Sequence, residues 1–272
     1  NRDGEQSNNL TQLPVSDKLK VKVIELCSGV GMQFRGLENT PCFEPELVAT
    51  SEINKDAILS YAAIHCGMTQ DMVDDYKFPH DEEMIQYLTD LNIGYEPEKD
   101  KPYNWNRCPK AKLKKYWLAC KLSKNLGDVS RIEKLPKADL WFISTPCTDI
   151  SVAGKLKGLN PDDNTRSSLV WQTIRILKEA QQTDTLPKYM MLENVKNLVG
   201  KRYIHDFEAF NELVEEFGYY SYYDVINAKN CGIPQNRERV FAVSIRKDVD
   251  TGKFEFPQAF DTGIRLFHVL DF

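Results

Sequence analysis

The chain has 272 residues, of which 42% are hydrophobic and 28% charged, and it carries a formal net charge of -5. This composition excludes a fibrous or disordered protein, and the negative charge argues against a general nucleic-acid coat protein, which would usually be basic. The seven cysteines form no C-x-x-C pair, so we expect reduced thiols of a cytoplasmic protein, with neither a metal site nor a disulfide framework. No apolar run approaches the roughly 20 residues of a membrane span, so we expect no membrane partner.

The first predicted elements are two strands, each followed by a polar turn. Residues 1–18 are polar and without periodicity, which predicts a loosely ordered tail. Val21–Leu26 reads as a strand that stops at a glycine turn, and Glu46–Ser51 as the next strand. Asn54 then favours the start of a helix over Lys55–His65, because an asparagine side chain caps free backbone N–H groups.

Residues 68–125 interrupt the alternation of strands and helices. The segment is polar and aromatic, with helical stretches at Asp81–Leu91 and Lys110–Leu122, and we interpret it as an insertion at the edge of a sheet. Residues 107–124 are rich in lysine, which permits contacts with phosphate groups, but a solvated helix face is the better interpretation.

The second half of the chain repeats the pattern of apolar strands and amphipathic helices. Strands are predicted at Asp139–Ser144, Tyr189–Leu192, Tyr219–Ile226 and Arg239–Ile245, and helices at Ser168–Ala180 and Ile204–Phe217. This alternation predicts an α/β fold with a mostly parallel sheet and helices on both faces. Ligands on such sheets bind at the carboxyl ends of the strands.

The turn after the first strand reads Cys-Ser-Gly-Val-Gly over residues 27–31. Glycine permits a close approach of the backbone to a ligand, and Glu52, at the end of the next strand, is suited to bind ribose hydroxyls. The third glycine of a dinucleotide-binding turn is replaced by Phe34, so a purely structural turn is an equally good interpretation.

A cysteine stands in the loop that follows a buried strand. Cys147 comes directly after Pro146, which restricts the backbone at this point. A thiol becomes a nucleophile when a positive neighbour favours the thiolate. A cysteine considered alone is more often a small packed residue, and only its surroundings favour a catalytic role.

Two further motifs lie near later strands. Glu193-Asn194-Val195 follows an apolar strand, where a carboxyl group serves either as a binding group or as a structural cap. Arg237 and Arg239, in Gln-Asn-Arg-Glu-Arg, lie on the same side of a strand because side chains alternate with period two. Such a pair can hold a carboxylate or a phosphate, or it can form ordinary surface salt bridges.

Taken in order, with Gly127–Asp128 between them, these motifs resemble the DNA cytosine-5 methyltransferase family of prokaryotic type. The resemblance covers about Val21 to Asp248. It implies a Rossmann-like fold that binds S-adenosylmethionine. It also implies a catalytic domain over residues 19–272 with an insertion at about 68–125.

The resemblance assigns catalytic roles to four residues. Cys147 attacks C6 of a cytosine flipped out of double-stranded DNA, so that C5 becomes nucleophilic and takes the methyl group from S-adenosylmethionine. Glu193 binds the ring N3 and the exocyclic amine. Arg239 contacts the flipped base, and Arg237 supports it.

The resemblance also implies contacts with the cofactor and the nucleic acid. The cofactor contacts are Cys27, Ser28, Gly29, Gly31, Glu52, Ile53, Asp128, Val129, Pro146 and Leu169. The nucleic-acid contacts are Ser151 and Gln235. For Asp128 the ordinary alternative is a turn aspartate, and for Leu169 a core leucine.

The sequence departs from the family pattern in three places. Cys27 stands where an aromatic residue is usual, and Thr145 and Thr148 flank Pro146–Cys147 where Phe and Gln are common. The target-recognition region and the final motifs have no counterpart before Phe272. We therefore expect a C-terminal fragment or partner subunit to carry target recognition.

Two other functions remain open at this stage. One is methylation of cytosine in tRNA, although the Cys-Phe-Thr signature of that subgroup is absent. The other is a non-catalytic methyltransferase-like partner subunit. The expected setting is the cytoplasm of a prokaryote or phage host, in a restriction-modification context.

Overall fold

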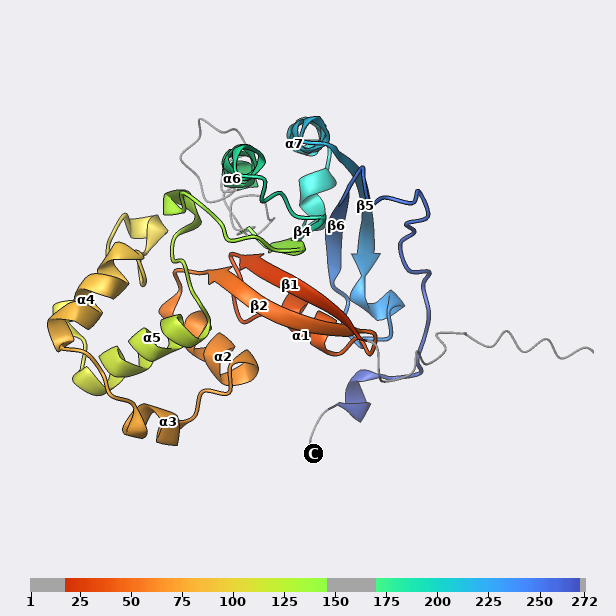
Figure 1. The fold of residues 1–272 in the computed structure, drawn as a ribbon. Helices are drawn as coiled ribbons and strands as arrows, with labels where there is room; N and C mark the ends of the chain where they lie inside the picture. The colour runs from red at the N-terminus through yellow and green to blue at the C-terminus, as the bar shows by residue number, and fades with distance from the viewer. Residues whose placement is uncertain (1–17, 146–169, 270–272) are drawn as a thin grey trace, which may run out of the picture.

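A six-stranded, mostly parallel sheet organises the residues that the computed structural model describes, 18–145 and 170–269 (Figure 1). The strand order is β2-β1-β3-β4-β6-β5. Its members are β1 (Leu19–Leu26), β2 (Phe43–Ser51), β3 (Leu140–Ile143), β4 (Tyr189–Val195), β5 (Tyr219–Asn227) and β6 (Glu238–Arg246). Strands β1 to β4 pair in parallel, whereas β6 runs antiparallel to both β4 and β5. The predicted fold class is confirmed.

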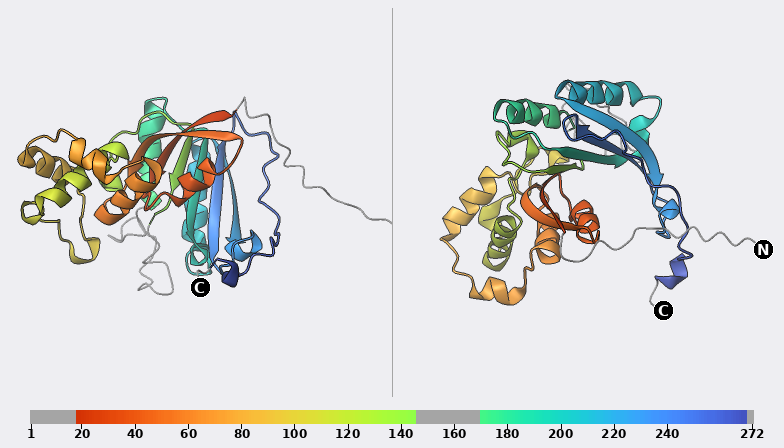
Figure 2. Two further views of the ribbon diagram at one scale, coloured as in Figure 1. Left: turned by 90° about the horizontal axis from the view of Figure 1, so that it is seen from below. Right: turned by 45° about the vertical axis from the view of Figure 1, so that its right-hand side comes forward.

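Helices cover both faces of this sheet (Figures 1 and 2). They are α1 (Met32–Glu38), α2 (Lys55–His65), α3 (Gln70–Asp75), α4 (Asp81–Asp90), α5 (Lys110–Leu122), α6 (Val170–Gln182) and α7 (Ile204–Glu216). Helices α6 and α7 pack on one face around the fully buried Trp141, and Phe34 of α1 packs on the other face against Phe142. Because adjacent strand residues point to opposite faces, neighbouring side chains of β3 serve both cores.

The segment between α2 and β3 forms a second hydrophobic cluster beside the β2 edge (Figure 1). Trp117 of α5 packs there with residues of α2, α3 and α4. Its lysines are engaged locally: Lys110 pairs with Asp81, and Lys121 lies 3.7 Å from the Tyr87 ring centroid. This favours the interpretation of a helix face over that of a phosphate-binding surface.

Several predicted helix boundaries agree with the structure, whereas the short helices α1 and α3 are not predicted from the sequence. Helices α2 and α5 have the predicted bounds, and Asn54 caps α2 by accepting the N–H groups of Asp56 and Ala57. Helices α1 and α3 were not predicted, because six or seven residues are too few to display a helical period. Strand β4 continues through Val195, so Glu193 lies within the strand rather than after it.

The turn at Gly127 gives a first testable prediction. Gly127 has φ 75°, and a Cβ atom there would lie 2.1 Å from the carbonyl oxygen of Leu91. We expect Gly127→Ala to lower the free energy of unfolding by about 3 kcal/mol or more, from left-handed strain together with a clash against fixed backbone. Gly67, with φ 66° and open space around its Cα, is the matched control, and Gly67→Ala should cost only about 1 kcal/mol. Urea denaturation measures both variants, and equal losses would contradict the clash.

Candidate functional site

The glycine turn that follows β1 contains three residues with a left-handed backbone conformation. Cys27, Gly29 and Gly31 have φ of 55°, 54° and 79°. The N–H of Ser28 donates to the carbonyl of Ser51, which joins the turn to the end of β2. A Cβ atom at Gly29 would meet nothing within 4 Å, so the backbone is open there to a ligand.

Glu52 holds this turn through its carboxylate. Oε2 accepts the N–H of Gly29 at 2.8 Å, and Oε1 accepts the N–H groups of Ile53 and Asn54 at 2.9 and 2.8 Å. Burial raises the pKa of Glu52, although these hydrogen bonds oppose the shift. A carboxylate offers about four acceptor positions, so roughly one remains on Oε2 for a ligand hydroxyl. Binding of a ribose stays a prediction.

Asp128 lies beside the same turn and caps a short 3-10 helix, η3 (Val129–Arg131). Oδ1 accepts the backbone N–H and the hydroxyl of Ser130 at 2.9 and 2.7 Å, as expected of a turn aspartate. Burial raises the pKa of Cys27, and the charges of Glu52 and Asp128 raise it further. The predicted cofactor residues Cys27, Glu52 and Asp128 therefore lie close together.

Asn92 is a site residue that the sequence analysis missed. It is buried, with φ 57°, and its Nδ2 donates to Oδ2 of Asp128 at 2.8 Å. The carbonyl of Leu91 accepts the N–H of Asp128, and the N–H of Gly94 donates to the carbonyl of Ile53. The turn after α4 thus supports Asp128 directly and the backbone next to Glu52. A left-handed asparagine after a helix is a recognisable stop signal, but it does not reveal its partner.

Val129 takes a different place from the one expected of a cofactor contact. Its side chain is buried in the main hydrophobic core. Its carbonyl accepts a hydrogen bond from Arg175 of α6 at 3.0 Å, and the same guanidinium reaches the carbonyl of Ile132 at 2.6 Å. Only the backbone of Val129 is therefore suited to face a ligand.

A second group of predicted residues meets at β4 and β6. The Arg239 Nε lies 3.1 Å from Oε1 of Glu193, and Arg237 Nη2 lies 4.0 Å from the same oxygen. Arg239 pairs in register with Val195 across the antiparallel strands. The predicted same-side arrangement of the two arginines is confirmed. The partly exposed carboxylate is held by one close guanidinium and approached by a second.

The segment that follows β3 is held by hydrogen bonds next to this ion pair. Asn194 Nδ2 donates to the carbonyl and the hydroxyl oxygens of Thr145, each at 3.3 Å. Thr145 is the last described residue before position 170. The predicted Pro146, Cys147, Ser151 and Leu169 lie outside the described residues.

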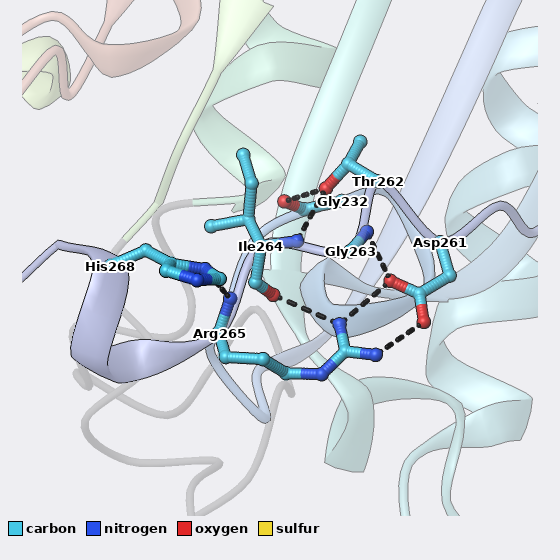
Figure 3. Close-up of polar contacts among 7 residues, drawn as sticks. All are labelled: Gly232, Asp261, Thr262, Gly263, Ile264, Arg265 and His268. Atoms are coloured by element: carbon cyan, nitrogen blue, oxygen red, sulfur yellow. Dashed lines mark hydrogen bonds and ion pairs between the residues drawn. The ribbon is translucent and has the colours of Figure 1, made fainter.

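The loop before Arg237 is fixed from two sides. Asn227 Oδ1 accepts the N–H of Arg237 at 3.1 Å, while Gln235 is exposed. The C-terminal segment packs on the loop, where Thr262 donates to the carbonyl of Gly232 and Arg265 pairs with Asp261 at 2.8 Å (Figure 3).

Two acidic side chains lie at the glycine turn. Neither Glu52 nor Asp128 forms an ion pair within residues 18–145 and 170–269. Both carboxyl groups act electrostatically on Cys27, so they flank the turn that is open at Gly29. The described part of the chain contains no cluster of residues suited to a metal ion and no helix able to cross a membrane.

Glu25 is a buried carboxyl group to which the sequence analysis gave no role. It accepts the hydroxyl of Tyr61 at 2.6 Å and the N–H of Phe34 at 3.2 Å. Burial raises the pKa of Glu25 from 4.5 to about 7, although these hydrogen bonds oppose the shift. The folded protein therefore favours the protonated carboxyl group.

This shift gives a prediction for stability against pH. A pKa raised on folding contributes stability that is full below about pH 4.5 and is lost as the pH rises through about 7. We expect the free energy of unfolding to fall by about 3 kcal/mol over this window because of Glu25. Urea denaturation at several pH values measures it, and the slope should be much smaller in Glu25→Gln. An unchanged slope in that variant would contradict the assignment.

Comparisons with known proteins identify the family of this chain. Residues 81–268 match the family of C-5 cytosine-specific DNA methylases. The type II methyltransferase M2.ScrFI of Lactococcus lactis subsp. cremoris is 43% identical over 88% of this chain and 64% of its own length. The orphan methyltransferase M.SssI of Spiroplasma monobiae is 34% identical over 83% of this chain and 59% of its own length. The chain thus spans about three fifths of these relatives.

Among solved structures, a methyltransferase of Entamoeba histolytica shares the fold. Its TM-score is 0.51 at 16% sequence identity, over 90% of this chain and 58% of that one. This likeness supports the assigned α/β methyltransferase fold.

Proposed function

Because the chain belongs to the C-5 cytosine-specific DNA methylase family, we propose that it methylates C5 of cytosine in double-stranded DNA, with S-adenosylmethionine as methyl donor. The observation that carries the proposal is the ion pair between Glu193 and Arg239. Next to Glu193, Asn194 donates a hydrogen bond to Thr145, which precedes Pro146 and Cys147 in the sequence. A carboxylate held by a guanidinium is suited to a pyrimidine edge.

The glycine turn is the proposed cofactor site. Gly29 gives open space for the ligand, and Glu52 and Asp128 supply negative charge toward a cation. When bound, S-adenosylmethionine supplies a methyl group on a positively charged sulfur. The proposed cofactor contacts are Cys27, Ser28, Gly29, Gly31, Glu52, Ile53, Asp128, Val129, Pro146 and Leu169.

The proposed reaction proceeds through a covalent adduct. The Cys147 thiolate forms a bond to C6 of a flipped cytosine, while Glu193 binds N3 and the exocyclic amine. C5 would take the methyl group from the sulfonium; its proton would then pass to solvent as the bond between sulfur and C6 breaks and the Cys147 thiolate is released. Arg239 holds Glu193 toward the base, with Arg237 behind it. The products are 5-methylcytosine and S-adenosylhomocysteine.

DNA recognition is proposed to involve Ser151 and Gln235, together with a further polypeptide segment. The C-terminal region and the loop before β6 expose apolar side chains, here called the apolar surface: Ile233, Phe260, Ile264, Leu266, Phe267 and Val269. The longer relatives carry additional residues, and we propose that such a segment, in the same chain or in a partner subunit, packs on this surface.

Substitutions on this apolar surface test the docking. Ile264→Asp and Leu266→Asp should weaken binding of the segment at least about tenfold while leaving the thermal stability of this chain unchanged, because both side chains are exposed. Unchanged binding would refute this partner surface.

The proposed setting is the cytoplasm of a prokaryote or phage host, with a role in restriction-modification. The bacterial relatives that match over most of the chain support this setting.

Trapping on 5-fluorocytosine DNA tests the function. Fluorine at C5 cannot leave as the proton does, so the adduct through Cys147 persists after denaturation. We expect a shifted band with duplex DNA and S-adenosylmethionine, in the presence of the C-terminal segment. A band with tRNA instead would indicate the tRNA reaction. Cofactor binding without any adduct would favour a non-catalytic partner subunit.

A further inference from the structure

A buried histidine lies directly beneath the glycine turn. The side chain of His65, at the end of α2, has no exposed area. Its ring packs against Tyr61 at 4.6 Å and edge-on against Phe34 at 5.5 Å between centroids. A Cβ atom at Gly31 would lie 2.5 Å from His65 Nε2. The turn therefore packs on this ring without room for any side chain at Gly31.

Both ring nitrogens of His65 face hydrogen-bond acceptors. Nδ1 lies 3.0 Å from Oε2 of Glu38, and Nε2 lies 3.1 Å from the carbonyl oxygen of Val30. A carbonyl oxygen has no proton to donate, and an ionised carboxylate has none either. Only the doubly protonated imidazolium carries an N–H at both positions. A neutral ring would leave one of the two contacts without a hydrogen bond in a buried place.

The charges around the ring come from three elements. Glu38 of α1 faces Nδ1 and also binds Arg35 at 3.2 Å. Glu25 of β1 is connected through the hydroxyl of Tyr61, and Cys66 follows at the end of α2. Glu38 and Glu25 favour a positive ring when ionised, whereas Arg35 opposes it. Glu25 adds negative charge only above its pKa of about 7, so below that pH Glu38 is the carboxylate that faces the ring.

The contact with Val30 reaches into the proposed cofactor site. Val30 lies between Gly29 and Gly31, so the orientation of its carbonyl group fixes the plane of the peptide between Val30 and Gly31. Glu52 fixes the same turn from the other side through the N–H of Gly29. Because the hydrogen bonds to His65 and Glu52 hold the turn, it is ordered before a ligand binds, which lowers the entropic cost of binding.

We propose that protonated His65 is a positioning residue that bridges Glu38 to the Val30 carbonyl and thereby organises the glycine turn for S-adenosylmethionine. The inference rests on the proposed function of that turn. A ring that loses one proton can donate only one of the two hydrogen bonds, and without the bond to Val30 this peptide is no longer held. Cofactor affinity therefore falls as the pH rises.

Calorimetric titration with S-adenosylmethionine at several values between about pH 5.5 and about pH 8.5 tests this proposal. Native protein should bind at least about tenfold more weakly at the upper end, as expected for the loss of one hydrogen bond of a charged group. His65→Gln should bind weakly at all these pH values and lose the pH dependence. His205→Gln is the matched control, because His205 is exposed on α7 and should leave the profile unchanged.

Nitrogen NMR of the His65 ring provides a readout that needs no cofactor and no variant. Two protonated ring nitrogens near pH 6 are expected, and one unprotonated nitrogen would overturn the proposal. Glu38→Gln keeps the ring, removes the carboxylate that faces Nδ1 and should weaken cofactor binding, which covers the case in which His65→Gln does not fold. Binding that is independent of pH in native protein overturns the positioning role alone. Absence of S-adenosylmethionine binding at every pH overturns the proposed function as well.

Discussion

Cys147→Ala should reduce methyl transfer to DNA by at least about 10³-fold, because loss of a catalytic nucleophile removes the covalent route and leaves only binding effects. Transfer of a labelled methyl group into duplex DNA measures the loss, and the denaturation-resistant adduct with 5-fluorocytosine DNA should vanish in the same variant. The affinity for S-adenosylmethionine should stay within about threefold, because the glycine turn, Glu52 and Asp128 are unchanged.

Cys42→Ala is the matched control for this experiment. Cys42 is a half-buried free cysteine just before β2, far in the sheet order from β4 and β6. It should retain full transfer and full trapping. Comparable losses of methyl transfer in the two variants would show that the thiols matter for folding. Retained transfer in Cys147→Ala would refute the nucleophilic role of Cys147.

Arg239→Ala should lower kcat/KM for DNA about 10²-fold, as is typical when a donor that orders a catalytic group is removed. The guanidinium that holds Glu193 at 3.1 Å disappears, and Arg237, at 4.0 Å and nearly half exposed, replaces it poorly. Steady-state kinetics on duplex DNA measures the change. Arg237→Ala should cost less, about fivefold, because its contact is longer and better solvated.

Lys196→Ala supplies the control for a general effect of surface charge. Lys196, directly after β4, pairs with Glu238 of β6 at 2.9 Å, but both groups are well exposed. Its removal should change kcat/KM less than about twofold. If Lys196→Ala and Arg239→Ala behave alike, the Glu193–Arg239 pair has no special role.

The sequence by itself determined the features that depend on local information. Helix α2 with its Asn54 cap, and the same-side placement of Arg237 and Arg239, follow from backbone periodicity and capping, which act over a few residues. The order of the motifs indicated the family, and the alternation of apolar strands with amphipathic helices indicated the fold class. Helix α1 escaped this reasoning because seven residues with one buried side chain display no clear period.

Only the tertiary structure decided which side chains meet. Asn92 and Asp128 are 36 residues apart, and so are Glu25 and Tyr61, yet each pair forms a hydrogen bond that no periodic pattern encodes. The burial of Val129 in the core was likewise decided by helix α6 packing over it. The same packing enclosed the ring of His65 under the glycine turn. A buried polar group takes its partner from whichever distant element the packing brings near, because an unpaired one is costly, and that choice is made only when the sheet and its helices assemble.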